Sequence, residues 1–408
     1  MLKPDHLQAH THSAAPPGAT PEAQEATVVF TNTTVANPDL VQDDVALAVE
    51  GDRIAAIVPT DEVLAGYPWA EIQDGRGKAL FPGLINTHAH MRAVIARGFN
   101  EDFGFPNTAG LAISPASLLE GEEGNLMVQV AALEAIRTGT TTIVEYTGNV
   151  GRQAGVLADS GLRCVLAEGI RDTENQSRAE YEFMVMHHGL RPAEYLDRHD
   201  FLGPRLFAAH ARYVNTEEVA LLGRSGTIIA HQAGMAANRG ISPPIPELRA
   251  AGCPIALGTD NNTNDVFEVM RIAMLTERIR RNRDGDEVPG LQPQPEDVLA
   301  DCTQGGALAV QQPDALGTLE VGKKADLLVV DMLRAHLVPA GRVISALVHS
   351  GHPGDIESVM VDGRFVMRDR EVVTMDEDAI IREADAVGKR IWGQVLEASP
   401  LNVPRLRR

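Results

Sequence analysis

The stretch Ala79–His90, ALFPGLINTHAH, decides the fold. It opens on an apolar run, which is typical of a strand buried on both faces. It ends on His88 and His90, whose side chains point to the same face of a strand because side chains alternate. Two imidazoles placed together suit zinc or iron. The stretch therefore predicts a buried parallel strand with a pair of metal ligands at its carboxyl end.

Three later apolar segments end in the same way. RLFAAHA brings His210 to a strand end, GTIIAHQ brings His231, and PIALGTD brings Asp260. A buried aspartate needs a partner, and a cation is the usual one. Because parallel strands of a barrel end at one edge, these side chains are expected to gather in one metal site.

Helical segments separate the strands. GNLMVQVAALEAIRTG (124–139) and TEEVALLGRSG (216–226) have helical periodicity and end on glycine, which suits a helix C-cap. Alternation of strand and helix predicts a parallel sheet, most simply a (β/α) barrel. Short β segments around Asp-Gly and Gly-Lys turns lie near both ends of the chain. They predict one composite β-sandwich beside the barrel.

These patterns divide the chain into parts. Residues 1–25 are predicted to form a disordered tail, although His10 and His12 have the spacing of a metal pair. Residues 26–80 and 320–375 are expected to form the sandwich. The barrel is expected over residues 81–319, and a C-terminal helix and tail over residues 376–408.

Composition excludes several classes of function. The 408 residues include 36 Lys and Arg against 56 Asp and Glu, a formal net charge of −20, which argues against nucleic acid and against a polybasic membrane anchor. No apolar run reaches the ~18–20 residues that span a bilayer, and no secretory signal is recognised. Cys164, Cys253 and Cys302 have neither disulfide-framework nor zinc-ribbon spacing, which predicts a reducing, cytoplasmic location.

The ordered motifs of the chain resemble the amidohydrolase superfamily. The motifs are FPGLINTHAH, RGFNEDF, LEAIRTGTTTIVE, AAHARYVNTEEVALLGRSGTIIAHQ, PIPELRAAGCPIALGTDNN and GTLEVGKKADLLVVD. They run from about Ala26 to Val373 and are most similar to the branch of cytosine, S-adenosylhomocysteine and triazine deaminases and chlorohydrolases. The resemblance implies a TIM-like (β/α) barrel, a composite β-sandwich and one catalytic divalent metal, zinc or iron.

The resemblance also implies roles for single residues. His88, His90 and Asp260 match the metal ligands, and Asp260 also takes the proton from the metal-bound water, whose pKa the metal lowers towards ~7. His210 matches the residue that orients this water or polarises the group under attack, as a general acid–base partner does. His231 matches a histidine nearer the substrate.

The loop after the first strand, RGFNEDFGFPN (97–107), is expected to lie over the pocket. Phe99, Phe103 and Phe105 can supply an aromatic wall for the substrate. An ordinary surface loop explains any single one of them equally well.

The chain departs from the family between the third and sixth strands. The family has a fifth-strand histidine as third ligand and a glutamate three residues later, and Thr173 and Gln176 fall at these positions, which places Gln176 near the substrate. About 35 residues separate Gly169 from Arg205, whereas one βαβ unit alone needs ~30. The barrel is therefore predicted to be short of strands 4–5.

Three explanations of this departure stay open. The shortened barrel has a defective metal site, or Glu145, Glu168 or Asp172 replaces the lost ligand, or the natural protein carries a segment that this sequence lacks.

The sequence thus predicts a hydrolase that acts on carbon–nitrogen bonds other than peptide bonds. Deamination of a small nitrogen heterocycle is expected first, and dechlorination or amine removal from a triazine-like ring next. The alternative is a non-catalytic, vestigial protein of the same fold that lacks the third ligand. A homo-oligomer is expected because dimers and larger assemblies are common in the family.

Overall fold

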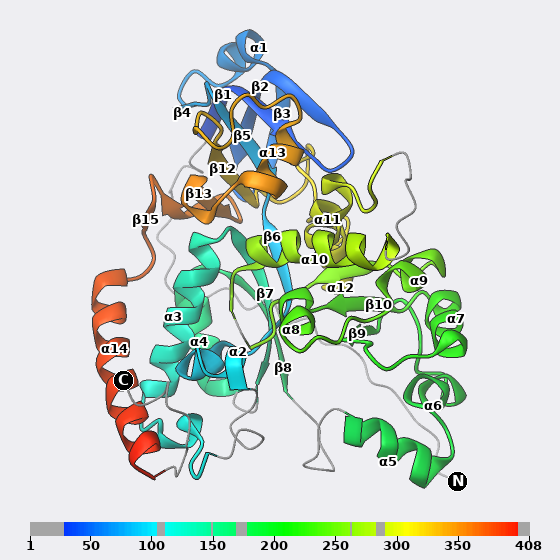
Figure 1. Ribbon diagram of the computed structural model, residues 1–408. Coiled ribbons are helices and arrows are strands. Elements are labelled where there is room, and N and C mark those ends of the chain that lie inside the picture. Colours follow the sequence, from blue (N-terminus) through cyan, green and yellow to red (C-terminus); the bar gives the residue numbers. More distant parts are fainter. Residues whose placement is uncertain are drawn as a thin grey trace, which may run out of the picture.

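The computed structural model describes residues 28–103, 111–147, 150–168, 178–261, 263–282 and 290–398. Figure 1 shows a large sheet built from both ends of the chain and, next to it, parallel strands with helices around them. The predicted tail over residues 1–25 lies outside the described residues. In the described ranges, none of the helices combines the length and the apolar character that a membrane span requires.

Both ends of the chain meet in one nine-stranded sheet. Its strands are β1 (Val28–Ala36), β2 (Val41–Glu50), β3 (Arg53–Pro59), β4 (Glu71–Asp74), β5 (Lys78–Pro82), β12 (Leu327–Asp331), β13 (Ile356–Val361), β14 (Arg364–Arg368) and β15 (Glu371–Val372). β5 joins the two halves, because it pairs in parallel with β1 and antiparallel with β12. The chain segments before and after the barrel are therefore hydrogen-bonded to each other.

This sheet curls over its own core. In the sheet order β14 lies four strands from β1, which corresponds to about 19 Å in a flat sheet at ~4.8 Å per strand. The rings of Phe30 on β1 and Phe365 on β14 nevertheless lie 6.4 Å apart, edge to face. Leu47, Leu80 and Leu327 are buried in the same core. One folded sheet, rather than two stacked sheets, therefore encloses the core that the sequence assigned to a sandwich.

Six parallel strands form the second part of the described fold. They are β6 (Leu84–Ala89), β7 (Thr140–Thr147), β8 (Arg163–Glu168), β9 (Phe207–Ala209), β10 (Ile228–His231) and β11 (Ile255–Leu257). They make two three-stranded sheets, in the orders β6-β7-β8 and β11-β10-β9. The two sheets meet where Ala89 bridges Asp260 in parallel. This α/β arrangement is consistent with the predicted (β/α) barrel.

The α-helices of the described chain lie between and after the strands of both parts. They are α1 (Thr60–Gly66), α2 (Asn100–Phe103), α3 (Glu123–Arg137), α4 (Val150–Ser160), α5 (Arg178–His188), α6 (Pro192–Arg198), α7 (Thr216–Ser225), α8 (Ala233–Asn238), α9 (Ile245–Ala250), α10 (Val266–Arg281), α11 (Pro295–Cys302), α12 (Gln304–Ala309), α13 (Val343–Ser350) and α14 (Glu377–Ala398). α3 and α7 fall where the periodicity predicted helices, and Gly226 ends α7 with a left-handed φ of 71°.

In Figure 1, α14 runs along the outside of α3, and Trp392 on α14 donates a hydrogen bond to the Ile95 carbonyl.

In the described part of the chain, β8 and β9 are the end strands of the arc. Within the described ranges, each of these two strands pairs with a strand on one side only. The described chain between them, residues 178–206, forms α5 and α6. The carboxyl ends of the six strands still face one edge, because all the pairings are parallel.

A buried cluster of charges ties this arc to the curled sheet. Arg163 begins β8, and its guanidinium contacts the carboxylates of Asp326, next to β12, and Asp362, in the turn after β13. The Asp326 side chain is only 6% exposed. Burial raises the pKa of Asp326, and the guanidinium opposes this shift. The positive charge of Arg163 therefore stabilises a buried carboxylate at the junction between the arc and the curled sheet.

Replacing Arg163 by methionine leaves the Asp326 carboxylate buried without its cation. We expect the free energy of unfolding, measured by urea denaturation, to fall by about 3 kcal/mol. Lys389→Met breaks the exposed pair with Asp385 and serves as the control, with an expected change below ~0.5 kcal/mol. Similar small losses in both variants would contradict a structural role for the Arg163 cluster.

Candidate metal centre

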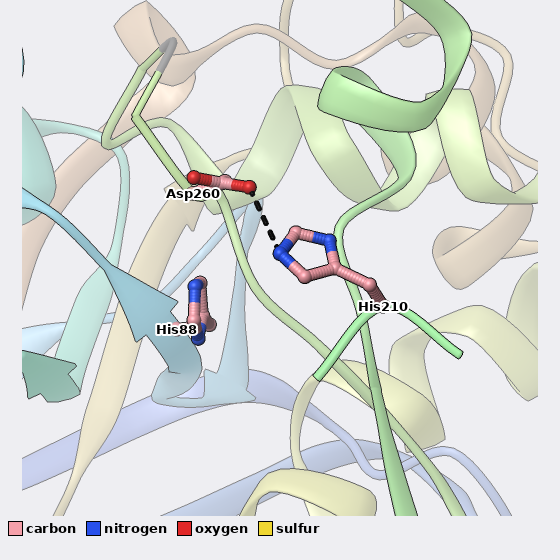
Figure 2. Close-up of side chains that lie close together, drawn as sticks. All are labelled: His88, His210 and Asp260. Carbon is pink, nitrogen blue, oxygen red and sulfur yellow. Dashed lines mark ion pairs between the residues drawn. The ribbon is translucent and has the colours of Figure 1, made fainter. Parts of the chain in front are cut away.

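Strand ends bring the predicted site residues together. His88 lies near the end of β6 and His231 ends β10, while His210 and Asp260 follow β9 and β11. Figure 2 shows His88, His210 and Asp260 close together, with an ion pair between the last two. One ligand atom from each of these three residues lies within 4.8 Å of the others. The fold thus gathers metal-ligating groups from two different sheets at one point.

His90, the second histidine of the first strand, lies beside this group. Its Nε2 is 3.6 Å from Asp260 Oδ1, and its ring centre is 4.9 Å from that of His88. Its Nδ1 lies 3.2 Å from the carbonyl oxygen of Tyr146, which can only accept a hydrogen bond. Neutral His90 therefore carries its proton on Nδ1, and the lone pair of Nε2 is free on the side of Asp260. A backbone partner of this kind commonly orients a metal-binding histidine.

The backbone of Asp260 and His210 is strained. Both residues have left-handed φ angles, 65° and 68°, which cost about 1–3 kcal/mol for side chains other than glycine. Hydrogen bonds hold these turns: the His210 amide donates to the Ala230 carbonyl and to Gln232 Oε1, and the Asp260 amide donates to the His88 carbonyl. Strain of this type clusters at functional sites, because the surrounding structure must enforce it.

Asn86 fastens β6 to the turn that carries Asp260. Its Oδ1 accepts hydrogen bonds from the amides of His88 and Thr259, at 3.3 and 3.1 Å, and its Nδ2 donates to Thr259 Oγ1. Gly258 allows this approach, because a Cβ there would lie 2.8 Å from the His88 nitrogen. The sequence analysis missed Asn86, although its place two residues before His88, on the same strand face, was the available signal.

Burial favours the neutral form of His88, His210 and His231. Burial, followed by the neighbouring His90 and His210, lowers the pKa of His88 to about 3. Burial also lowers the pKa of His210, although Asp260 opposes this shift. Burial and then Arg249 lower the pKa of His231 to about 3. A metal binds the neutral form of imidazole, so these rings are in the form that ligation requires.

Two buried atoms test whether these residues fit a metal. Among the described residues, His88 Nε2 and Asp260 Oδ2 have no hydrogen-bond partner. Asp260 Oδ2 lies 3.4 Å from His210 Nε2, which is beyond the ~2.7–2.9 Å of a charge-assisted hydrogen bond. Buried polar atoms without partners are costly, and one cation between these atoms satisfies them. The donor set of imidazoles and a carboxylate fits a divalent metal such as zinc.

Other predicted residues lie apart from this group. Glu145 is buried on β7, and its Oε2 accepts the Met91 amide at 2.9 Å. His231 is buried at the end of β10, with its Nδ1 unpaired among the described residues. Phe99 is buried with its ring 5.2 Å from that of Trp392 on α14, so it packs between the first loop and that helix.

The remaining predicted residues stay predictions. Phe103 ends α2 and Glu168 ends β8. Gln176, Thr173, Asp172 and Phe105 lie outside the described residues.

Comparison with known proteins relates this site to a known family. Residues 173–366 match the model of the amidohydrolase family. This part of the chain is therefore similar to an amidohydrolase domain. This domain contains His210, His231 and Asp260, and the matching region ends at Val366 in β14.

Proteins similar to this chain include two deaminases. A 5-methylthioadenosine/S-adenosylhomocysteine deaminase of Desulforudis audaxviator is 27% identical, with 88% of this chain and 96% of the relative aligned. A 5'-deoxyadenosine deaminase of Methanothermobacter thermautotrophicus is 27% identical, over 85% of this chain and 95% of the relative. These relatives confirm the predicted resemblance and the predicted class, a hydrolase of carbon–nitrogen bonds other than peptide bonds.

Solved structures share the fold. An adenosine deaminase from Xanthomonas campestris with bound zinc has a TM-score of 0.77 at 22% identity, covering 90% of this chain and 98% of that chain. An atrazine chlorohydrolase from Arthrobacter aurescens complexed with zinc has a TM-score of 0.72 at 18% identity, covering 88% and 100%. At these identities the likeness concerns the fold alone.

The alignment with the Desulforudis relative also shows a difference in length between the two proteins. It spans 424 positions, more than the 408 residues of this protein, although only 88% of the chain takes part. Since 88% of the chain is about 359 residues, about 65 aligned positions hold no residue of this chain. The relative therefore contains segments that this chain lacks.

Glu145 makes stability depend on pH. Burial raises its pKa to about 8, and the Met91 amide opposes the shift. Because the folded pKa exceeds the unfolded value of ~4.3, stability is lost as pH rises from ~5 through 8. Glu145→Gln keeps an acceptor for Met91 but cannot ionise, so we expect it to lose less stability than the wild type over this range, by on the order of 2–4 kcal/mol.

Chemical denaturation at pH 5 and pH 8.5 measures this difference. Glu62→Gln, at an exposed glutamate of α1, is the matched control and should follow the wild type. Parallel behaviour of Glu145→Gln and the wild type would contradict the assignment of a buried, protonated Glu145.

Proposed function

We propose that this protein is a metal-dependent deaminase that acts on the ring of a small nucleoside. The observation that carries the proposal is the convergence of ligand atoms from His88, His210 and Asp260 within 4.8 Å, at the carboxyl ends of parallel strands. We assign one divalent metal, zinc or iron, to His88, His90 and Asp260. Bound there, the metal supplies the positive charge that lowers the pKa of water from 15.7 towards ~7.

Asp260 is the proton acceptor in this proposal. Its side chain is only 3% exposed, and its Oδ2 has no hydrogen-bond partner in the described part of the chain. The oxygen of the attacking water forms a bond to the ring carbon that bears the amino group, and Asp260 takes the proton. His210, 3.4 Å from the carboxylate, helps to pass a proton to the amino group as its carbon–nitrogen bond breaks and ammonia leaves.

The substrate class is proposed from the relatives. Their names give 5-methylthioadenosine, S-adenosylhomocysteine and 5'-deoxyadenosine as substrates. We therefore assign an adenosine modified at its 5' position to this protein. His231, Gln176 and Phe103 remain the residues predicted to face it.

We also propose that the barrel lacks strands 4 and 5 of the family. The unpaired sides of β8 and β9 and the unfilled positions in the alignment with the Desulforudis relative support this. We propose the same domain limits as the sequence analysis. They are residues 26–80 with 320–375 for the curled sheet, 81–319 for the barrel and 376–408 for the C-terminal helix and tail. A cytoplasmic location and a homo-oligomer stay predictions.

The alternative function is that of a vestigial, non-catalytic protein. The open side of the arc between β8 and β9 favours it, because a closed barrel would contribute a pocket wall there. Metal-loaded protein distinguishes the two, since a vestigial site binds metal without turnover.

Ammonia release tests the proposed function. Protein supplied with zinc or iron(II) should release ammonia from 5'-methylthioadenosine or 5'-deoxyadenosine. Asp260→Asn should lower kcat/KM at least ~100-fold, because it removes the proton acceptor. Asp369→Asn, at an exposed aspartate, is the control and should keep full activity. Metal-loaded wild type without ammonia release would establish the vestigial alternative, and wild-type rates in Asp260→Asn would remove this residue from the mechanism.

A further inference from the structure

We infer that Glu134 is a positioning residue that joins the chain after His90 to the chain after Asp260 and thereby sets where the substrate lies. Two segments of the chain are concerned. The first-strand segment, residues 91–103, contains the 3₁₀ helix η1 (Met91–Ala96) and α2. The Asp260 segment, residues 263–265, leads from the turn after β11 into α10. The effect on turnover rests on the proposed function, whereas the contacts themselves do not.

The carboxylate of Glu134, on α3, is the common acceptor of three side chains. Its Oε1 accepts a hydrogen bond from the hydroxyl of Thr263 at 2.9 Å. Its Oε2 accepts from the side-chain amide of Asn264 at 3.1 Å and from the guanidinium of Arg97. One carboxylate can accept all three, because its two oxygens offer about four lone-pair sites. Glu134 is therefore bonded to both segments at once.

α3 holds the chain that leaves Asp260. The backbone of Asp260 is strained, with φ 65°, and the surrounding structure must enforce such a turn. After the turn, Thr263 and Asn264 are bonded to Glu134. The carbonyl of the buried Asn264 also accepts the hydroxyl of Thr138, at the end of α3, at 3.3 Å. The carboxylate of Glu134 thus anchors the segment on the far side of the strained turn.

The first-strand segment follows the edge at which the metal ligands gather. It begins directly after His90, and its helix η1 packs against α3. Its helix α2 lies beside α8, which follows His231 at the end of β10. It also contains Phe103, one of the residues predicted to face the substrate. Arg97 lies between η1 and α2, so its bond to Glu134 anchors the middle of this segment.

An exposed ion pair alone does not explain this arrangement. The Arg97 side chain is 46% exposed, and such pairs contribute little to stability. The Glu134 side chain is only 21% exposed, and its partner Asn264 is buried. Loss of the carboxylate frees both segments, and a displacement of ~1 Å within a site can lower the rate ~100-fold. The main effect of Glu134 is therefore expected on the placement of the substrate rather than on stability.

Deamination kinetics of the metal-loaded protein test the inference. Glu134→Leu keeps a good helix former and removes every acceptor, so we expect KM for 5'-methylthioadenosine to rise at least ~10-fold. Glu134→Gln keeps one acceptor oxygen and should restore part of the loss. Both variants should still bind about one zinc ion per chain, because the Asp260 amide is held by the His88 carbonyl and not by Glu134.

Arg97→Met separates a positioning role from a merely structural one. It removes the donor of the first-strand segment and should raise KM in the wild-type background. In Glu134→Leu it should change KM little, because the shared acceptor is already absent. A merely structural Glu134 would lower stability and leave KM unchanged. Additive effects of Arg97→Met and Glu134→Leu on KM would overturn the inference.

Hydrogen–deuterium exchange gives a readout that needs no turnover. In Glu134→Leu, the amides of residues 91–103 and of residues 263–268 should both exchange faster than in the wild type, because both segments lose an anchor. Glu296→Gln, which breaks a partly exposed pair with Arg342, is the matched control and should follow the wild type in both segments.

Each other outcome has a definite meaning. Faster exchange in one segment only, or an unchanged KM at full zinc content, would overturn the inference. Metal-loaded wild type that releases no ammonia would instead overturn the proposed function, and the exchange result would still decide whether Glu134 joins the two segments. If Glu134→Leu does not fold, as judged by circular dichroism, Glu134→Gln and Arg97→Met decide the question through the same measurements.

Discussion

The backbone hydrogen bonds between the end of β6 and the turn after β11 hold the rest of the site in place. The amides of Thr259 and Asp260 donate to the His88 carbonyl at 3.0 and 2.8 Å, and the His90 amide donates to the Asp260 carbonyl at 3.3 Å. These bonds join the two three-stranded sheets. They also place the side chains of His88, His90 and Asp260 next to each other.

This seam explains how a short arc of strands can keep a preformed site. In a closed barrel every strand has two neighbours, whereas β8 and β9 each have one in the described chain. The seam between β6 and β11 lies in the middle of the strand order, away from the open side. Asn86 and Thr87 reinforce it, through Thr259 and the Leu257 carbonyl. The positions of His88, His90 and Asp260 therefore depend on the seam rather than on the described end strands β8 and β9.

The sequence predicted the features that local patterns control. Apolar runs ending on His or Asp located the strand ends of His88, His210, His231 and Asp260, and glycine located the end of α7. The pairing of β5 with β12 could not be read from the sequence, because it joins segments more than 240 residues apart and no local periodicity encodes a partner. The curl of the sheet follows from that pairing, so the sandwich was predicted without its single-sheet topology.

In the site, too, local patterns predicted residue positions but not the contacts between distant segments. Residue types and strand ends predicted that His88, His210 and Asp260 gather, whereas His231 lies apart from them. The distances depend on backbone turns at positive φ, which the sequence does not signal at Asp260 and His210. Asn86 was missed because its role is to bind the backbone of another strand.

Metal content per chain tests the central claim most directly. The protein is purified without chelators, and zinc and iron are measured by plasma mass spectrometry against protein concentration, for the wild type and for His88→Ala. The account predicts about one metal ion per wild-type chain and almost none in the variant. A folded wild-type protein with a ratio near zero after incubation with zinc or iron(II), or a variant that retains the full wild-type content, would contradict it.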